Sequence, residues 1–266
     1  MRYKVPIIEH VGDNFKRMTL DAPEIAQTCV PGQFVHVLCA DPKNSNDPLL
    51  RRPFSIHDAD ADTGRISILY EVRGRGTALL GDRLQGEEIN IIGPLGKGFS
   101  LPEDDELPIF VSGGIGAAPL YFLACRIVKE FGFECIMGAR TAKTLVCNEE
   151  FKKLSHSQDG NLVCTNDGTL GTQALVTELL IKRLDSLGTG VSPIIYACGP
   201  TPMLKAVSKI AVERGIRCQI STEAKMACGV GACMGCVIKV KDGDSTKYVR
   251  CCKEGPVFNA DEIIWD

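Results

Sequence analysis

The carboxyl-terminal part of the sequence contains a dense group of cysteines. Cys228, Cys233 and Cys236 have the spacing C-x4-C-x2-C, and the adjacent Cys251 and Cys252 follow. This spacing with a distant fourth cysteine is typical of plant-type [2Fe–2S] ligands. Zinc is the main alternative, but its sites usually pair the ligands in two short arms. The sequence therefore predicts a [2Fe–2S] centre, and the spacing leaves the fourth ligand open between Cys251 and Cys252.

Two motifs near the start of the chain could bind a flavin nucleotide. The first places a guanidinium, an imino acid, an aromatic ring and a hydroxyl on the consecutive residues Arg52, Pro53, Phe54 and Ser55. A guanidinium suits a diphosphate, and the other groups suit the flavin ring. The second runs from Leu69, Tyr70 and Glu71 to Gly76 and Thr77, where Thr77 is expected to cap a short helix whose first amides bind an anion. A solvated arginine pair and an ordinary N-cap are the alternatives.

Two glycine-containing turns, each between an expected strand and an expected helix, could bind a dinucleotide. The first contains Gly113, Gly114 and Gly116, and the second contains Cys198, Gly199 and Pro200. Neither is the G-x-G-x-x-G fingerprint, so each alone is weak evidence, but together they favour a dinucleotide site. Arg140 ends another expected strand, where a carboxylate for the ribose often stands, and this leaves NAD against NADP open.

The composition limits the remaining classes of function. The formal net charge of −3, from 30 basic and 33 acidic residues, gives no electrostatic signature of a nucleic-acid partner or an anionic membrane. The first ten residues lack the apolar core of a secretion signal, and no run of residues is long and apolar enough to span a bilayer, so we expect a cytoplasmic protein. Most of the 13 cysteines are scattered and are expected to be reduced thiols.

The pattern of apolar runs predicts three parts. Short strand-like runs up to residue 101 predict an antiparallel β-barrel, and the acidic, proline-flanked segment 102–108 predicts a linker. Strand and helix patterns then alternate up to residue 220, which predicts an α/β domain with a parallel sheet and a ligand at the carboxyl ends of its strands. Residues 221–266 form the expected cluster-binding lobe.

The order of these motifs resembles that of the ferredoxin–NADP reductase superfamily. The tail, CGVGACMGC with CKEGPVF, is similar to that of the electron-transfer subunits of class 1B dihydroorotate dehydrogenases, and the similarity covers essentially the whole chain. The resemblance implies an FAD-binding barrel, an NAD domain and a [2Fe–2S] lobe. It also selects Cys252 as the fourth ligand and assigns flavin contacts to Arg52, Pro53, Phe54, Ser55, Leu69, Tyr70, Glu71, Gly76 and Thr77.

The function that this resemblance implies is electron transfer in pyrimidine biosynthesis. Electrons from a separate FMN-containing dihydroorotate dehydrogenase subunit would pass through the cluster and FAD to NAD⁺, in a heterotetramer of two copies of each chain. No acid–base residue is expected in this chain, because the chemistry belongs to the cofactors. The rivals are a subunit of an NADH-dependent ferredoxin:NADP oxidoreductase or a sulfide dehydrogenase, and a zinc-stabilised nucleotide-binding regulator.

Overall fold

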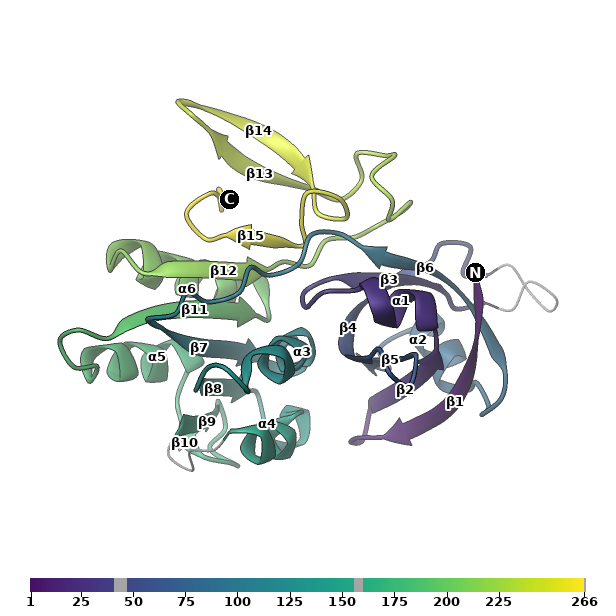
Figure 1. The fold of residues 1–266 in the computed structure, drawn as a ribbon, viewed down its shortest axis with the longest axis horizontal. Coiled ribbons are helices and arrows are strands. Elements are labelled where there is room, and N and C mark those ends of the chain that lie inside the picture. The colour runs from purple at the N-terminus through teal and green to yellow at the C-terminus, as the bar shows by residue number, and fades with distance from the viewer. Residues whose placement is uncertain (41–46, 156–159, 266) are drawn as a thin grey trace.

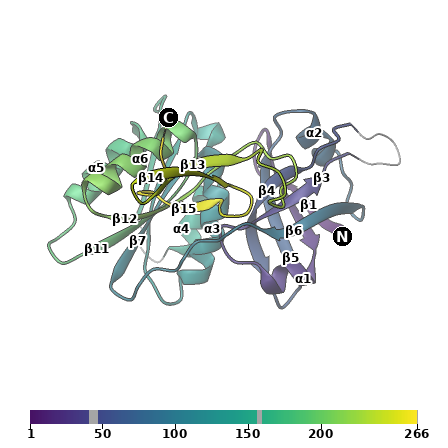
Figure 2. The ribbon, with the colours of Figure 1, turned by 90° about the horizontal axis from the view of Figure 1, so that it is seen from above.

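The computed structural model describes residues 1–40, 47–155 and 160–265. A barrel from the first part of the chain lies beside a sheet flanked by helices, and a small cysteine-rich lobe lies over the junction between them (Figures 1 and 2). No helix in these described ranges has the length and apolar content needed to cross a membrane.

The barrel consists of six antiparallel strands in the closed order β1-β2-β5-β4-β3-β6. Their bounds are β1 (Arg2–His10), β2 (Phe15–Asp21), β3 (Phe34–Leu38), β4 (Arg52–Asp60), β5 (Arg65–Glu71) and β6 (Glu88–Leu95). Side chains of a strand alternate between its two faces. In β3, Val35 and Val37 pack in the barrel core, whereas Phe34 packs with the cysteines of the lobe. Two short helices, α1 (Pro23–Thr28) and α2 (Arg75–Gly81), complete this part.

The second part is a seven-stranded sheet in the order β10-β9-β8-β7-β11-β12-β15. The strands are β7 (Glu106–Gly113), β8 (Glu134–Ala139), β9 (Asn161–Thr165), β10 (Thr172–Gln173), β11 (Ser192–Cys198), β12 (Arg217–Ser221) and β15 (Val257–Asn259). All neighbours pair in parallel except β15, which runs antiparallel to β12. The predicted combination of an antiparallel barrel and a parallel-sheet domain is confirmed.

Helices cover both faces of this sheet, because its strands bury side chains on both sides. Phe110 packs in the core that includes α3 (Ala117–Ile127) and α4 (Asn148–Leu154). Its neighbours Ile109 and Val111 pack in the opposite core with α5 (Val176–Asp185) and α6 (Thr201–Glu213). The 3₁₀ turns η1 (Gly114–Gly116) and η2 (Ala142–Thr144) lie at the carboxyl ends of β7 and β8.

The carboxyl-terminal lobe consists of the cysteine loop, a hairpin and a returning strand. The hairpin pairs β13 (Val237–Asp242) with β14 (Ser245–Arg250). The chain then returns as β15 and adds an edge strand to the nucleotide-domain sheet through pairs such as Ile220 with Phe258. The lobe is therefore joined to the sheet by backbone hydrogen bonds.

Two local expectations were wrong. The apolar spacing of residues 172–184 predicts one helix, but Thr172 and Gln173 form the short strand β10 beside β9, and the helix begins at Val176. Thr77 is the third residue of α2 and not its N-cap, a position that Gly74 occupies. Its hydroxyl instead accepts hydrogen bonds from the backbone N–H groups of Arg73, at 2.9 Å, and Gly74, at 3.1 Å.

Candidate functional site

The cysteine loop brings four thiols together as two pairs. The Cys228 and Cys233 side chains lie within hydrogen-bonding reach of each other, and so do those of Cys236 and Cys252. The loop can coil this tightly because Gly229 and Gly231 adopt positive φ angles of 69° and 77°.

Backbone N–H groups of the same loop point at two of these sulfurs. The Cys233 N–H donates to Cys228 Sγ at 3.4 Å, and the Gly231 N–H donates to Cys252 Sγ at 3.2 Å. Hydrogen bonds from the Cys233 backbone, with smaller contributions from other loop amides, lower the pKa of the Cys228 thiol to about 6. The loop therefore favours the thiolate, which is the form that binds a metal.

The two adjacent cysteines have different surroundings. The Cys251 thiol is fully buried and lies 3.6 Å from Thr222 Oγ1 and 3.7 Å from the Thr222 carbonyl oxygen. The Cys252 thiol faces Cys236 and the Gly231 N–H group. This geometry supports Cys252 as the fourth ligand.

The arrangement fits a two-iron cluster better than a single ion. Within the described part of the chain, no group of three or more His, Cys, Asp or Glu side chains is placed to hold one metal ion. In a [2Fe–2S] centre two irons share four protein ligands, so two separate thiol pairs satisfy it. A tetrahedral zinc site would need all four sulfurs around one point.

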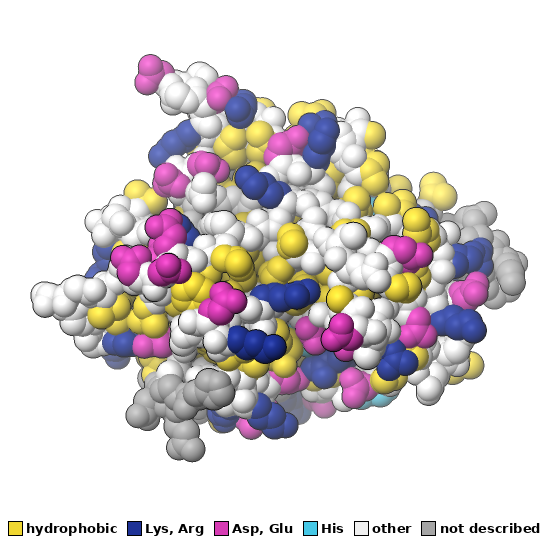
Figure 3. All heavy atoms as spheres, viewed as in Figure 1, with side chains coloured by type: hydrophobic (Ala, Val, Ile, Leu, Met, Phe, Trp, Pro, Cys, Tyr) yellow, Lys and Arg dark blue, Asp and Glu magenta, His cyan; other side chains and the backbone are white. Residues whose placement is uncertain are grey.

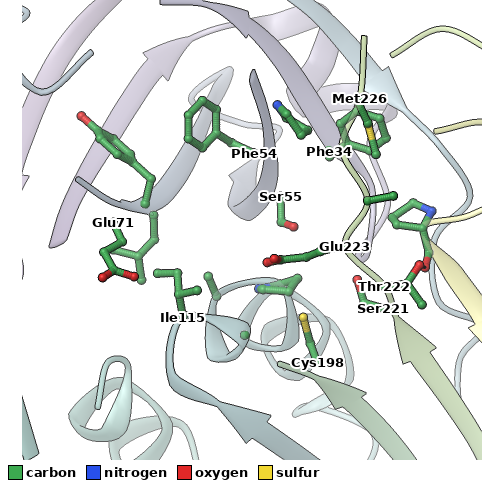
Figure 4. A pocket seen from close by; sticks show the side chains of 18 of the residues that line it. Phe34, Phe54, Ser55, Glu71, Ile115, Cys198, Ser221, Thr222, Glu223 and Met226 are labelled. Carbon is green, nitrogen blue, oxygen red and sulfur yellow. The ribbon is translucent and has the colours of Figure 1, made fainter. Parts of the chain in front are cut away.

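A cavity of about 230 Å³ lies between the barrel and the nucleotide domain. Pro53, Phe54 and Ser55 of β4 and Leu69, Tyr70 and Glu71 of β5 line its barrel side. The rings of Phe54 and Tyr70 meet edge to face, with centroids 5.4 Å apart. In Figure 4, Ser55 and Glu223 extend into the cavity from opposite walls, with Ile115 and Cys198 on the nucleotide-domain side. A planar, partly polar cofactor such as a flavin ring fits these walls.

The other expected flavin contacts lie together outside this cavity. Arg52 packs against Gly76, where an added Cβ would lie 3.4 Å from Arg52 Nε. The Arg52 guanidinium donates to the Leu50 carbonyl at 2.8 Å, and the Thr77 hydroxyl is occupied at the start of α2. These three residues form one patch beside the cavity, which supports a role at the diphosphate rather than at the ring.

A second, larger cavity of about 540 Å³ lies at the carboxyl ends of the parallel strands. Gly113, Gly114 and Gly116 line it from one turn, and Gly199 and Pro200 line it from the other. The two turns touch: an added Cβ on Gly116 would lie 2.2 Å from the Cys198 carbonyl oxygen. The predicted pair of turns therefore meets at one place on the sheet edge.

The two cavities share part of their walls. Glu71, Arg73, Ile115, Gly116 and Glu223 line both. Arg73 Nε donates to Glu71 Oε2 at 2.6 Å, so the charges of this pair compensate each other at the junction. Because the cavities share these walls, a nicotinamide in the second cavity would lie next to a flavin in the first.

Cys198 lines only the first cavity. Burial raises the pKa of its thiol to about 12, so the thiol is neutral.

Arg140 lines the second cavity but not the first. It follows β8 directly, and its guanidinium makes no hydrogen bond or ion pair with the residues that the structure describes. Asn166, which follows β9, lies at the same edge. A guanidinium in this position is available to a phosphate or an adenine ring.

Several cavity residues were missed in the sequence. The segment after β12 contributes Thr222, Glu223, Ala224 and Met226 to the flavin-sized cavity, and Phe34 and Pro256 complete it. The rule that ligands lie beyond the carboxyl ends of parallel strands could have indicated Thr222 and Glu223, because they follow β12. No local signal indicates Phe34 or Pro256, since long-range packing brings both to the wall.

Three features define the class of this protein as an iron–sulfur flavoprotein oxidoreductase. They are the barrel with its flavin-sized cavity, the dinucleotide cavity beside it and the four-cysteine loop. Two family models match the chain: the oxidoreductase NAD-binding domain over residues 110–209, and the iron–sulfur cluster binding domain of dihydroorotate dehydrogenase B over residues 223–264.

Individual relatives agree. The dihydroorotate dehydrogenase B (NAD(+)) electron transfer subunit of Desulforamulus reducens is 38% identical over 264 residues, which is 99% of this chain and 97% of that protein. The structure of an NADH-dependent reduced ferredoxin-NADP oxidoreductase matches with a TM-score of 0.84 and 26% identity, over 99% of this chain and 90% of that one. A ferredoxin NADP⁺ reductase from Neisseria gonorrhoeae with bound FAD and NADP shares the fold, with a TM-score of 0.63 and 20% identity over 81% of this chain and 91% of that one.

The chain belongs to the family of dihydroorotate dehydrogenase B (NAD⁺) electron transfer subunits. The family models give it an iron–sulfur cluster binding domain and an oxidoreductase NAD-binding domain. The rival assignment to an NADH-dependent ferredoxin:NADP oxidoreductase has the weaker support, since the identity to that structure is 26% against 38% to the curated subunit.

Proposed function

We propose that this chain carries electrons between a separate FMN-containing dihydroorotate dehydrogenase subunit and NAD⁺, in a cytoplasmic heterotetramer of two copies of each chain. One observation carries the proposal: the two cavities and the cysteine loop adjoin one another. Met226 lines the flavin-sized cavity and stands two residues before Cys228, while five residues line both cavities. When bound, the cluster carries single electrons, and the flavin exchanges a hydride with the nicotinamide.

The residues divide the work between three parts, for which we propose the limits 1–101, 102–220 and 221–266. Cys228, Cys233, Cys236 and Cys252 hold the cluster. Arg250 braces their loop, because its guanidinium donates to the Gly231 carbonyl at 2.6 Å and pairs with Glu254 at 2.5 Å. This brace fixes the loop that presents the thiols to the cluster.

For the flavin, we propose that Pro53, Phe54, Ser55, Leu69, Tyr70 and Glu71 hold the ring, and that Arg52, Gly76 and Thr77 hold the diphosphate. The buried Tyr70 hydroxyl has no hydrogen-bond partner among the described residues, which supports a polar cofactor at this wall. The dinucleotide is held by Gly113, Gly114, Gly116, Gly199 and Pro200, where glycines let the backbone approach it closely. Cys198, which the sequence assigned to this group, lines the flavin-sized cavity instead.

The surface around the cysteine loop fits a protein partner. Val230 and Met234 lie between the ligands in the sequence and are 47% and 60% exposed, and Tyr248 on the hairpin is 61% exposed. Figure 3 shows hydrophobic side chains at the surface on this side of the molecule. Exposed apolar side chains beside a redox centre suit the docking of the FMN subunit, because docking excludes water and shortens the path for electrons.

The function is tested by reconstitution. The chain, with its iron, sulfide and flavin counted, is mixed with the FMN-containing subunit, dihydroorotate and NAD⁺. We expect orotate and NADH only when both subunits are present. Formation of orotate without this chain would reject the proposal. So would formation of NADPH from NADP⁺ with NADH and reduced ferredoxin as the electron donors, when no orotate is formed.

The docking surface has its own test. Met234→Lys places a charge in the proposed interface and should weaken the association of the two subunits at least tenfold, measured by isothermal titration calorimetry. Val212→Lys is the matched control, because Val212 is similarly exposed at 51% but lies on α6. Equal effects of the two substitutions would place the interface elsewhere.

A further inference from the structure

The outer face of β3 supports the cluster loop, and one buried histidine lies on this face. Phe34 packs with Cys236, Cys251 and Cys252, and His36 is the next residue on the same side of the strand. The cluster lobe therefore covers a part of the barrel wall that contains an imidazole.

The His36 side chain is fully buried and lies directly against the cysteine loop. An added Cβ on Gly229 would lie 2.2 Å from His36 Nδ1 and 2.7 Å from Cε1, so the ring occupies the space where any other residue at position 229 would place its side chain. Gly229 follows the ligand Cys228, whose backbone also lies next to the ring without the geometry of a hydrogen bond. The ring is therefore fixed at the edge of the cluster site.

Both ring nitrogens lack a hydrogen-bond partner among the described residues. A buried polar group without a partner destabilises the fold, and an imidazole always has at least one N–H group to donate. The Arg51 guanidinium donates to the His36 carbonyl at 3.2 Å, and the Arg51 backbone also lies next to the ring without the geometry of a hydrogen bond. The acceptor for the N–H group of the His36 ring would therefore belong to the group that the adjacent cysteine loop binds.

We propose that His36 is a positioning residue that donates a hydrogen bond to the sulfur shell of the [2Fe–2S] cluster and thereby raises its reduction potential. The inference rests on the proposed cluster site. Reduction adds negative charge to a cluster, and a donor at its sulfurs stabilises that charge. His36 would thus help set the driving force between the cluster and the flavin, whose proposed cavity includes the paired residue Pro53.

The test is an EPR-monitored redox titration of the full chain with its cofactors loaded. His36→Leu should shift the midpoint of the cluster to a more negative potential, and His36→Gln, which keeps an N–H donor, should recover part of the shift. Val37→Ala is the control, because Val37 lies on the same strand but faces the barrel core. An unchanged midpoint in His36→Leu with normal iron content would overturn the proposal and would indicate that a buried water satisfies the ring.

A measurement on the wild-type chain keeps the proposal testable if His36→Leu does not fold. Histidine labelled with ¹⁵N in the ring should give a weak nitrogen coupling to the reduced cluster in pulsed EPR, and His36→Gln should remove it. The other three histidines of the chain stay labelled in that variant. A cluster without this coupling refutes the role of His36 alone, whereas a preparation with no cluster refutes the proposed function itself.

Discussion

At the scale of the residue, the neighbouring cysteines 251 and 252 should respond in opposite ways to substitution. Cys252→Ser removes a proposed iron ligand and should lose most of the bound iron and sulfide. Cys251→Ser exchanges a thiol that contacts Thr222 and should keep the cluster, at a cost of about 1 kcal/mol of stability. Iron and sulfide analysis of the purified chains checks both outcomes. Loss of the cluster in Cys251→Ser alone would reverse the assignment.

Arg140 provides a prediction about the choice of nucleotide. A guanidinium at the carboxyl end of β8 suits the 2′-phosphate of NADPH, whereas a carboxylate there would suit the ribose of NADH. Arg140→Gln should therefore lower kcat/KM for NADPH about tenfold more than kcat/KM for NADH, measured as ferricyanide reduction by the loaded chain. The affinity for 2′,5′-ADP in calorimetry should fall in parallel. Equal losses for both nucleotides would show that Arg140 does not read this phosphate.

At the scale of the element, the contact between the two nucleotide turns depends on the absence of a side chain. Gly116→Ala would place a methyl group 2.2 Å from the Cys198 carbonyl oxygen and would force the turns apart. We expect a loss of about 1–3 kcal/mol of stability and a raised KM for NADH. Gly132→Ala is the matched control, because its added methyl group meets no atom within 4 Å. Urea unfolding and steady-state kinetics measure the two effects.

The sequence predicts those parts of the site that are encoded in short windows. The cysteine spacing fits within nine residues, and the glycine turns each follow a strand, so both can be recognised from the order of the residues alone. Phe34 and Pro256 cannot, because they reach the flavin-sized cavity only through the closure of the barrel and the return of the chain as β15. The choice between Cys251 and Cys252 also depends on a fold-level contact, that of Cys251 with Thr222.

At the scale of the whole molecule, the barrel and the nucleotide domain meet at a buried histidine. His57 of β4 is only 2% exposed, its Nδ1 lies 3.1 Å from the Ala118 carbonyl oxygen of α3, and its ring stacks on Tyr121 with centroids 4.9 Å apart. Burial, with a smaller contribution from the positive charge of Arg17, lowers the pKa of His57 to about 4. The interface that forms the flavin-sized cavity therefore requires a neutral imidazole.

This shift predicts how stability depends on pH. The unfolded chain takes up a proton near pH 6.5 and the folded chain only near pH 4, so stability is lost as the pH falls between these values. From pH 7 to pH 5 this single group should cost about 2 kcal/mol of unfolding free energy. Burial raises the pKa of the neighbouring Asp58. The folded chain therefore binds this proton more readily than the unfolded chain, so Asp58 adds stability as the pH falls.

The measurement that isolates His57 is therefore the difference between the wild type and His57→Gln, both unfolded in urea at pH 7 and pH 5 with the same cofactor content. Glutamine can still donate to the Ala118 carbonyl, but it does not titrate. The variant should be less stable at pH 7, because it loses the stacking on Tyr121, and it should lose about 2 kcal/mol less than the wild type on going to pH 5. Parallel losses in the two proteins would mean that the folded chain protonates His57 as readily as the unfolded chain does, and that the interface does not require a neutral imidazole.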